Sequence, residues 1–440
     1  MPISRILRLL LRPLIVLAAS TPIIMLLLSI ETGPTVSSAD SLTAEEMTRI
    51  EQLLIESAPS SPGIPGSQSM DLSVDELNLF LDYGLNLLDL SRAWATQLSL
   101  EEGLLQSEVS IEILSDWIPL YLNINSEFVQ VENRLQLEKV TVGKLQIPDR
   151  LVGLGLARLR NNLTQATPVF EDINQLIANV EKIDISGSQM QVQIHWDPEL
   201  IGKISDDAQQ LFITDDDRIR IIGYYESINA IATTIPADIR AISLNALLVP
   251  LFTEALERSD SGNDPIDENR SLLQALAIYV SNEDLSQLVG ETMAAEVPRA
   301  KFIEVRLQRR QDLAQHVSSI AAISALAGAE LAKFLSTTKE AYDARYRSGF
   351  SFSDLTANTV GVTLANYLTA NSASAIEMQR RLSKILTESD YMPEVGNNRD
   401  GISETDFNAI YIDRNSTEYN QRLEEIQSLI DARPLFQGLQ

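Results

Sequence analysis

The spacing of apolar residues differs between two parts of this chain, and the difference indicates two kinds of structure. Between residues 94 and 147, apolar residues recur at every second position in several short runs, as in Val109, Ile111 and Ile113. This period is typical of antiparallel strands with one covered face. After residue 217 the apolar residues recur at every third or fourth position, which is typical of packed helices. The sequence therefore predicts an α+β fold.

The same pattern, with the turn residues, gives the expected domain boundaries. Residues 70–213 are predicted to form an antiparallel β-rich domain with flanking helices, and residues 217–440 an all-α helical domain. Residues 40–69 are predicted to be a short helix followed by a linker, because residues 58–69 (APSSPGIPGSQS) are rich in proline, serine and glycine.

The N-terminus has the order of charges that is typical of an export signal. Three arginines precede the uncharged segment Pro13–Ile30, which is about 27 Å long as a helix and thus long enough to cross a bilayer. These arginines are Arg5, Arg8 and Arg12. Residues 1–39 are therefore interpreted as a signal anchor or a cleaved signal peptide, with a small-residue site at Ser37-Ser38-Ala39. A buried helix of a soluble protein is the third alternative.

The anchor is favoured, because the apolar run is long for a cleavable signal. Arginines before the span are typical of the cytoplasmic side. The prediction is a single-pass inner-membrane protein of a bacterial envelope, which contacts the membrane through residues 13–30 and has residues 40–440 in the periplasm.

Charge and cysteine content exclude several classes of function. A net charge of −27 argues against a nucleic-acid partner, since few basic residues are left to neutralise phosphates. The chain has no cysteine, so disulfides, thiol nucleophiles and zinc–thiolate sites are excluded. No cofactor is predicted.

One stretch, residues 310–361, holds ionisable residues at helical spacing. Asp312 and His316, Lys339 and Asp343, and Asp354 and Asn358 are each four residues apart, which places each pair on one face of a helix. With Glu340, these residues form the candidate catalytic set.

Two chemistries and one structural alternative follow from this set. His316 is suited to acid–base catalysis near neutral pH, oriented by Asp312. If a metal binds, the expected ligands are His316, Glu340, Asp343 and Asp354. The alternative is that these residues only cap helices, form i,i+4 ion pairs and hydrogen-bond between helices. No Gly-x-Ser-x-Gly element supports a serine hydrolase.

Two parts of the chain resemble known families of envelope proteins. Asp312-x-x-x-His316, Lys339-Glu340-x-x-Asp343 and the segment 348–361 resemble the YfiM-like family and, more distantly, VanZ-like membrane proteins. The order of elements in residues 70–213, with Asp75-Glu76-Leu77-Asn78 and Gly143-x-Leu145-x-Ile147-Pro148, resembles YpmS-like anchored extracytoplasmic proteins. The second resemblance implies a β-rich module with room for an apolar ligand such as a lipid.

Two functions are therefore weighed. The first is a non-enzymatic binding or scaffolding module for a lipid or an envelope protein in envelope maintenance. The alternative is a hydrolase or transferase that acts on envelope material through the Asp/His/Glu cluster.

Overall fold

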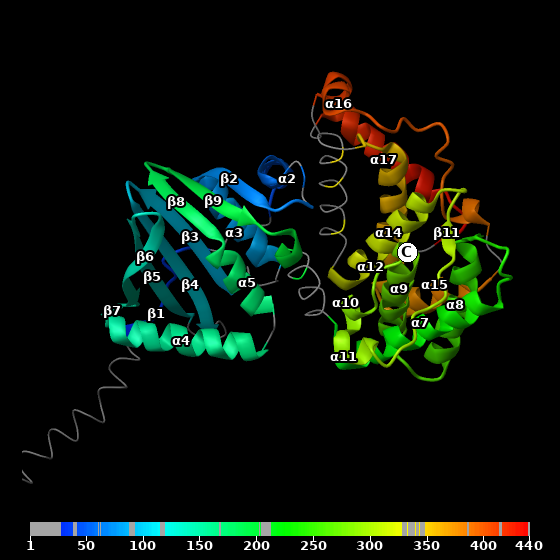
Figure 1. Ribbon diagram of the computed structural model, residues 1–440, viewed down its shortest axis with the longest axis horizontal. Coiled ribbons are helices and arrows are strands. Elements are labelled where there is room, and N and C mark those ends of the chain that lie inside the picture. The colour runs from blue at the N-terminus through cyan, green and yellow to red at the C-terminus, as the bar shows by residue number, and fades with distance from the viewer. Residues whose placement is uncertain are drawn as a thin grey trace, which may run out of the picture. The chain divides into compact units, whose positions relative to one another are not determined.

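The computed structural model separates into two compact units (Figure 1), a β unit formed from Met1–Ile50 and Ser61–Ile201 and a helical unit formed from Glu51–Ser60 and Gly202–Gln440. The structure describes residues 28–37, 42–59, 61, 63–87, 93–114, 119–166, 169–201, 203, 213–327, 332, 339, 343, 348–384, 387–412 and 416–438. The first unit is a mixed α+β domain built on antiparallel sheets, and the second is mainly helical.

The main sheet of the β unit follows the chain from strand to strand. Its order is β3 (Trp94–Glu101), β4 (Leu104–Leu114), β5 (Leu120–Val131), β6 (Arg134–Val142) and β7 (Leu145–Gln146), all antiparallel. The alternating apolar residues of the sequence occupy one face of this sheet. The predicted antiparallel sheet is thus confirmed.

A second, three-stranded sheet has the order β2 (Gly66–Ser73), β9 (Gln189–Trp196) and β8 (Val180–Ser186). β9 and β8 form the hairpin that follows α5 (Val169–Ala178), and His195 lies exposed on β9 beside Glu181. The predicted linker over residues 58–69 was wrong at its end, because β2 begins at Gly66 and pairs along its whole length with β9. Backbone pairing with a distant strand overrides local turn propensity here.

Helix α3 (Val74–Leu87) begins with a capping box, in which the Ser73 backbone N–H donates to Glu76 and the Glu76 N–H donates to the Ser73 hydroxyl. Asn78 then bonds to the edge strand β3. Its carbonyl accepts from the Leu98 N–H at 2.6 Å, and its amide donates to the Leu98 carbonyl at 2.9 Å. The Asn78 amide therefore makes the two backbone hydrogen bonds that a neighbouring strand would make, and it holds the helix against the sheet.

The β unit begins before the predicted folded region. Ile30 and Glu31 form β1, which pairs with Leu122 and Tyr121 of β5. The Asn123 side chain donates to Glu31 and to the Gly33 carbonyl, and Val36 is buried. The interpretation of residues 1–39 as signal or anchor was therefore wrong for residues 28–37, which are part of the sheet domain.

The remaining part of the predicted anchor, residues 13–27, lies outside the described residues. Within the described part of the chain, no helix combines the length and the apolar character needed to cross a bilayer.

The helical unit is built around α9 (Pro265–Ser281), which is buried over most of its length. α7 (Asp215–Thr234), α8 (Asn245–Asp260), α12 (Gln311–Ala327), α14 (Phe352–Thr369) and α15 (Ser372–Leu382) pack around it. The shorter elements are α10 (Ser286–Val289), α11 (Glu291–Ala294), a 3-10 turn at Glu388–Asp390, α16 (Glu404–Tyr411) and α17 (Thr417–Asp431).

The prediction of an all-α second domain was wrong in one detail. β10 (Ala241–Ser243) pairs in parallel with β11 (Glu304–Arg306), and this pair leads directly into α12. The central residue of β11, Val305, is fully buried, so this short strand fills the core as an apolar helix turn would.

Candidate functional site

Helices α12 and α14 carry four of the predicted site residues and pack closely against each other. Gly361 of α14 makes this possible. A Cβ at Gly361 would lie 2.7 Å from the Val317 carbonyl oxygen and 3.0 Å from the Ala321 backbone nitrogen of α12. Glycine is thus needed here for close approach of two backbones, one turn away from His316 and Asn358.

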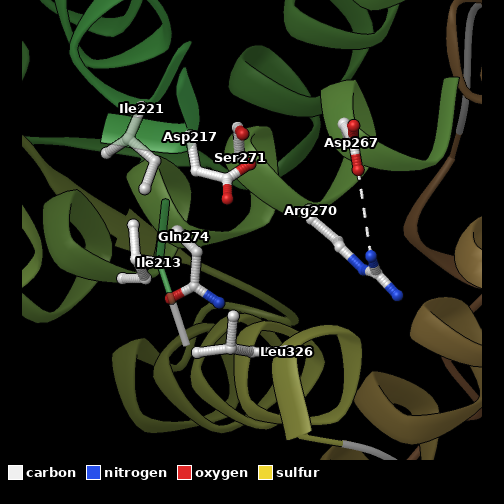
Figure 2. A pocket seen from close by; sticks show the side chains of 8 residues that line it. All are labelled: Ile213, Asp217, Ile221, Asp267, Arg270, Ser271, Gln274 and Leu326. Atoms are coloured by element: carbon white, nitrogen blue, oxygen red, sulfur yellow. Dashed lines mark ion pairs between the residues drawn. The ribbon is translucent and has the colours of Figure 1, made fainter. Parts of the chain in front are cut away.

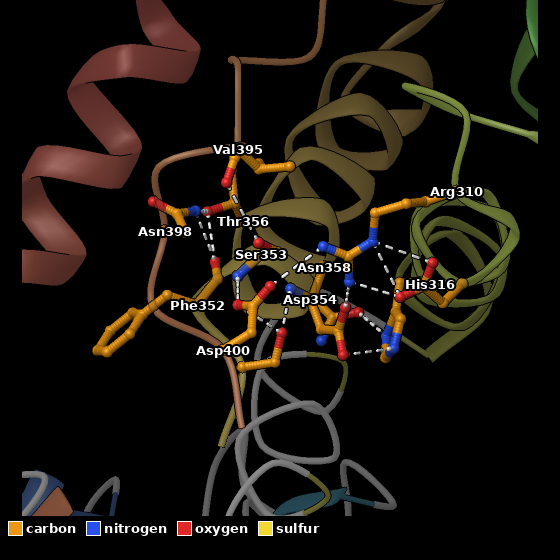
Figure 3. Close-up of polar contacts among 12 residues, drawn as sticks. Arg310, His316, Phe352, Ser353, Asp354, Thr356, Asn358, Val395, Asn398 and Asp400 are labelled. Atoms are coloured by element: carbon orange, nitrogen blue, oxygen red, sulfur yellow. Dashed lines mark hydrogen bonds and ion pairs between the residues drawn. The ribbon is translucent and has the colours of Figure 1, made fainter. Parts of the chain in front are cut away.

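Arg310 precedes α12 and reaches three aspartates (Figure 3). Its guanidinium lies 2.5 Å from Asp312, 3.2 Å from Asp354 of α14 and 3.1 Å from Asp400. A tight turn at Gln308 and Arg309, which have φ values of 49° and 67°, directs the Arg310 side chain toward these aspartates. Such left-handed residues are strained. Contacts of Gln308 with Glu388 and the Pro393 carbonyl hold the turn in place.

The arginine shifts the acidity of its partners. Burial raises the pKa of Asp312, but the hydrogen bond and charge of Arg310 outweigh burial, so the pKa lies below its usual value. Burial also raises the pKa of Asp400, and bonds from Ser353, Ser351 and Arg310 more than reverse this. In return, the hydrogen bond with Asp312 raises the pKa of Arg310. These groups stay charged at neutral pH.

Asp400 joins a loop to the start of α14. One carboxylate oxygen accepts from the Ser351 hydroxyl and the Ser353 N–H, both at 2.9 Å, while the other faces Arg310. Ser351 also accepts from the Asp354 N–H and so caps the helix. A carboxylate at this end is favoured by the helix dipole.

His316 lies between two polar groups of α14. Its Nδ1 is 2.9 Å from the Asn358 carbonyl oxygen, and its Nε2 is 3.5 Å from the second carboxylate oxygen of Asp354. The His316 side chain is 13% exposed and that of Asp354 is 17% exposed. The two ring nitrogens of His316 thus face the Asn358 carbonyl oxygen and the Asp354 carboxylate.

Asn358 is almost fully buried, and its amide nitrogen has no hydrogen-bond partner among the described residues. Its carbonyl alone is satisfied, by His316. The cost of such a buried donor is about 1–3 kcal/mol. The polar contacts between α12 and α14 therefore do not complete the hydrogen bonding of this side chain.

Two other predicted residues form an ion pair. Lys339 lies 3.0 Å from Asp343, whose backbone carbonyl accepts from the Gly349 N–H at 2.9 Å. Glu340 lies outside the described residues. The structure thus brings together Asp312, His316, Asp354 and Asn358 around Arg310, and it pairs Lys339 with Asp343.

The cation at the centre of this cluster is an arginine. No group of three or more His, Asp or Glu side chains among the described residues has the arrangement needed to hold a metal ion. Three carboxylates converge on the guanidinium of Arg310, which occupies the place that a divalent cation would take in such a set. The arrangement ties α12, α14 and the 393–402 loop together.

Sequence reasoning missed Arg310 and Asp400 as members of this cluster. Arg310 entered the prediction only as the first residue of the stretch 310–361, and Asp400 lies in a loop with no helical spacing to its partners. The one sequence feature near Asp400 that marks a close backbone approach is the next residue, Gly401. In the structure Gly401 packs against Gly349, which has a φ of 88°. A Cβ at Gly349 would lie 2.4 Å from the Gly401 carbonyl carbon, so this loop has to cross the start of α14 closely.

A small polar pocket opens elsewhere in the helical unit (Figure 2). Its volume is about 120 Å³, and its lining includes Asp217, Asp267, Arg270 and Gln274. Ligand sites for small molecules usually measure about 300–1,000 Å³. This pocket is the size of a few water molecules, and its charged residues are already paired, Asp267 with Arg270 and Asp217 with the neighbouring Arg220.

In the β unit, the apolar face of the main sheet is only partly covered. It carries Trp94, Leu98 and Leu100 of β3; Leu105, Val109 and Ile111 of β4; Leu122, Ile124 and Phe128 of β5; and Leu135, Leu137, Val140 and Val142 of β6. None of these side chains is fully buried, and Trp94 is 38% exposed. The helical unit, by contrast, has many apolar side chains with no exposed surface.

No family model, curated protein or solved structure gives a significant match to this chain. The resemblances to YfiM-like, VanZ-like and YpmS-like proteins stay predictions.

Proposed function

We propose that this chain is a single-pass protein of the bacterial envelope whose β unit binds an apolar ligand, a lipid acyl chain, and whose helical unit is a scaffold. The observation that carries the proposal is the accessible apolar face of the main sheet, defined by the residues from Trp94 to Val142 described above. A closed domain core would bury these side chains completely.

The energetics favour an occupant for this face. Burial of apolar surface contributes about 25 cal/mol per Å², so each leucine or isoleucine that is only partly buried leaves part of its stabilisation unrealised. An acyl chain supplies only apolar contacts, which suits the part of the face that pairs Leu105 with Phe128 and Ile111 with Leu122 across the strands. The charged residues Glu108, Glu112, Glu127 and Lys139 lie on the opposite face, whereas the small polar residues Ser107 and Ser126 share the apolar face.

The attachment of residues 28–37 supports an uncleaved anchor. Cleavage after Ala39 would remove β1 and the buried Val36. It would also remove Thr35, whose backbone N–H donates to the side chains of Ser110 and Asn123. An anchor that ends at the sheet also keeps the β unit next to a source of lipid.

The Arg310 cluster supports the scaffolding role of the helical unit. Its carboxylates are engaged by one arginine and by the N-terminal cap of α14. A hydrolase would need a free nucleophile or activated water within about 3–3.5 Å of the base.

The experiment compares two variants with the same new side chain on adjacent positions of β3. Leu100 lies on the apolar face, and Ser99 is exposed on the other. In a titration of the full chain with a fluorescent fatty acid, L100Q is expected to weaken binding about tenfold or more, since burying a leucine is worth about 1.5–3 kcal/mol. S99Q is expected to bind as the unchanged chain does. Equal affinities for all three proteins, or no saturable binding, would overturn the proposal.

A further inference from the structure

We infer that helix α4 (Asp149–Ala166) is a second membrane contact, which lies along the bilayer surface beside the point where the N-terminal anchor joins the β unit. The inference rests on the proposed anchor and adds an interfacial surface to it. The partner it commits to is a bilayer that contains anionic lipid.

The first observation is the exposure of apolar side chains on α4. Leu151 is 50% exposed, Leu154 is 68% exposed and Leu156 is 51% exposed. Leu151 and Leu154 are three residues apart and share a face, whereas Leu156 turns toward β6 together with Val152. The helix therefore packs one side on the sheet and leaves two leucines on its outer side.

The second observation is the charge around these leucines. Lys144, Arg150 and Arg158 are exposed, and Asp149 is the acidic residue between Gly143 and Arg158. The whole chain carries a net charge of −27, whereas this segment has a positive net charge. A helix with exposed leucines flanked by basic residues is typical of binding at the interface of an anionic membrane.

The third observation is where the apolar N-terminal segment ends. The backbone carbonyl of Leu28 accepts from the Lys144 N–H at 2.8 Å, in the turn between β6 and β7 that leads into α4. A Cβ at Gly143, which has a φ of 55°, would lie 2.5 Å from that same carbonyl oxygen. Leu28 is 37% exposed and follows directly on the uncharged run that begins at Pro13.

These contacts fix the exit of the anchor close to the start of α4. In Figure 1, α4 runs along the edge of the β unit where β1 and β7 lie. With no free linker between the apolar run and the sheet, an anchored chain holds this edge at the membrane. α4 then extends about 27 Å along the surface, with Leu151 and Leu154 available to enter the headgroup region.

The absence of cysteine makes a direct test possible, because single-cysteine variants can be spin-labelled without background. The full chain is reconstituted in vesicles with phosphatidylglycerol and labelled as L154C, V131C or A19C. Val131 is the matched control, an apolar residue that is 49% exposed at the far end of the β5–β6 hairpin. Collision rates of the label with oxygen and with a water-soluble nickel chelate report depth.

L154C is expected to shift toward oxygen over nickel collisions, and V131C toward nickel. A19C reports the anchor itself and is expected to lie deep in the bilayer. If A19C is deep while L154C has the aqueous behaviour of V131C, the inference about α4 is overturned and the anchor stands. If A19C is aqueous, the anchor fails and the inference falls with it. Deep labels at both L154C and V131C would also overturn a specific docking face.

Discussion

Replacing Gly361 by alanine is expected to destabilise the helical unit, although alanine is the better helix former. The new Cβ would lie 2.7 Å from the Val317 carbonyl oxygen and 3.0 Å from the Ala321 nitrogen, and both contacts are with backbone. Ordinary contact begins at 3.4 Å, so α12 and α14 have to move apart by about 0.7 Å. That movement also lengthens the bond between His316 and Asn358.

The magnitude is a difference between two effects. Overpacking costs about 1–3 kcal/mol, and the cost lies at the upper end because neither backbone atom can rotate away. The higher helix propensity of alanine stabilises the helix by about 1 kcal/mol relative to glycine. The net loss is therefore about 2 kcal/mol, which corresponds to a fall in Tm of about 4–8 °C for a unit of this size.

Thermal unfolding followed by circular dichroism measures this loss, with G223A as the matched control in α7. A Cβ at Gly223 would meet only the flexible end of the Arg258 side chain, at 3.3 Å. G223A is expected to raise Tm or leave it unchanged. A G361A protein as stable as the unchanged chain would refute the reasoning that glycine sets the distance between α12 and α14.

Three further outcomes are expected. R310M is expected to lower the free energy of unfolding by about 1–2 kcal/mol at pH 7. This is less than for a fully buried ion pair, because the aspartates that contact Arg310 are partly exposed to solvent. Since the folded-state pKa values of Asp312 and Asp400 are lowered, this difference should disappear in urea titrations as the pH falls from about 4 through those values. G143A should release residues 28–37 to limited proteolysis, whereas G187A, with a φ of 61° and no atom within 4 Å, should not. H316A should lower Tm and leave fatty-acid affinity unchanged; lost affinity with an unchanged Tm would favour an active site.

Local patterns predicted the elements that depend on neighbours in sequence. Alternation predicted the strands between residues 94 and 147, of which β4 and β5 are the longest. Helical spacing placed Asp354 and Asn358 on one face of α14, where both reach His316. Such features require only a period or a short motif.

Long-range contacts decided what the sequence did not predict. β1 is two residues long and is defined only by its pairing with β5, so the apolar run gave no sign that it ends in a sheet. Asp400 reaches Arg310 from a loop, where no period links it to its partners. The turn at Gln308 and Arg309 has non-glycine residues with positive φ, which turn propensity does not favour.

Native mass spectrometry of the full chain, extracted from membranes in mild detergent, tests the central claim most directly. The account predicts that the unchanged chain and S99Q carry a bound lipid mass and that L100Q has lost most of it. A chain that carries no lipid, or the same lipid occupancy in L100Q as in S99Q, would contradict the claim that the apolar face of the main sheet is a lipid site.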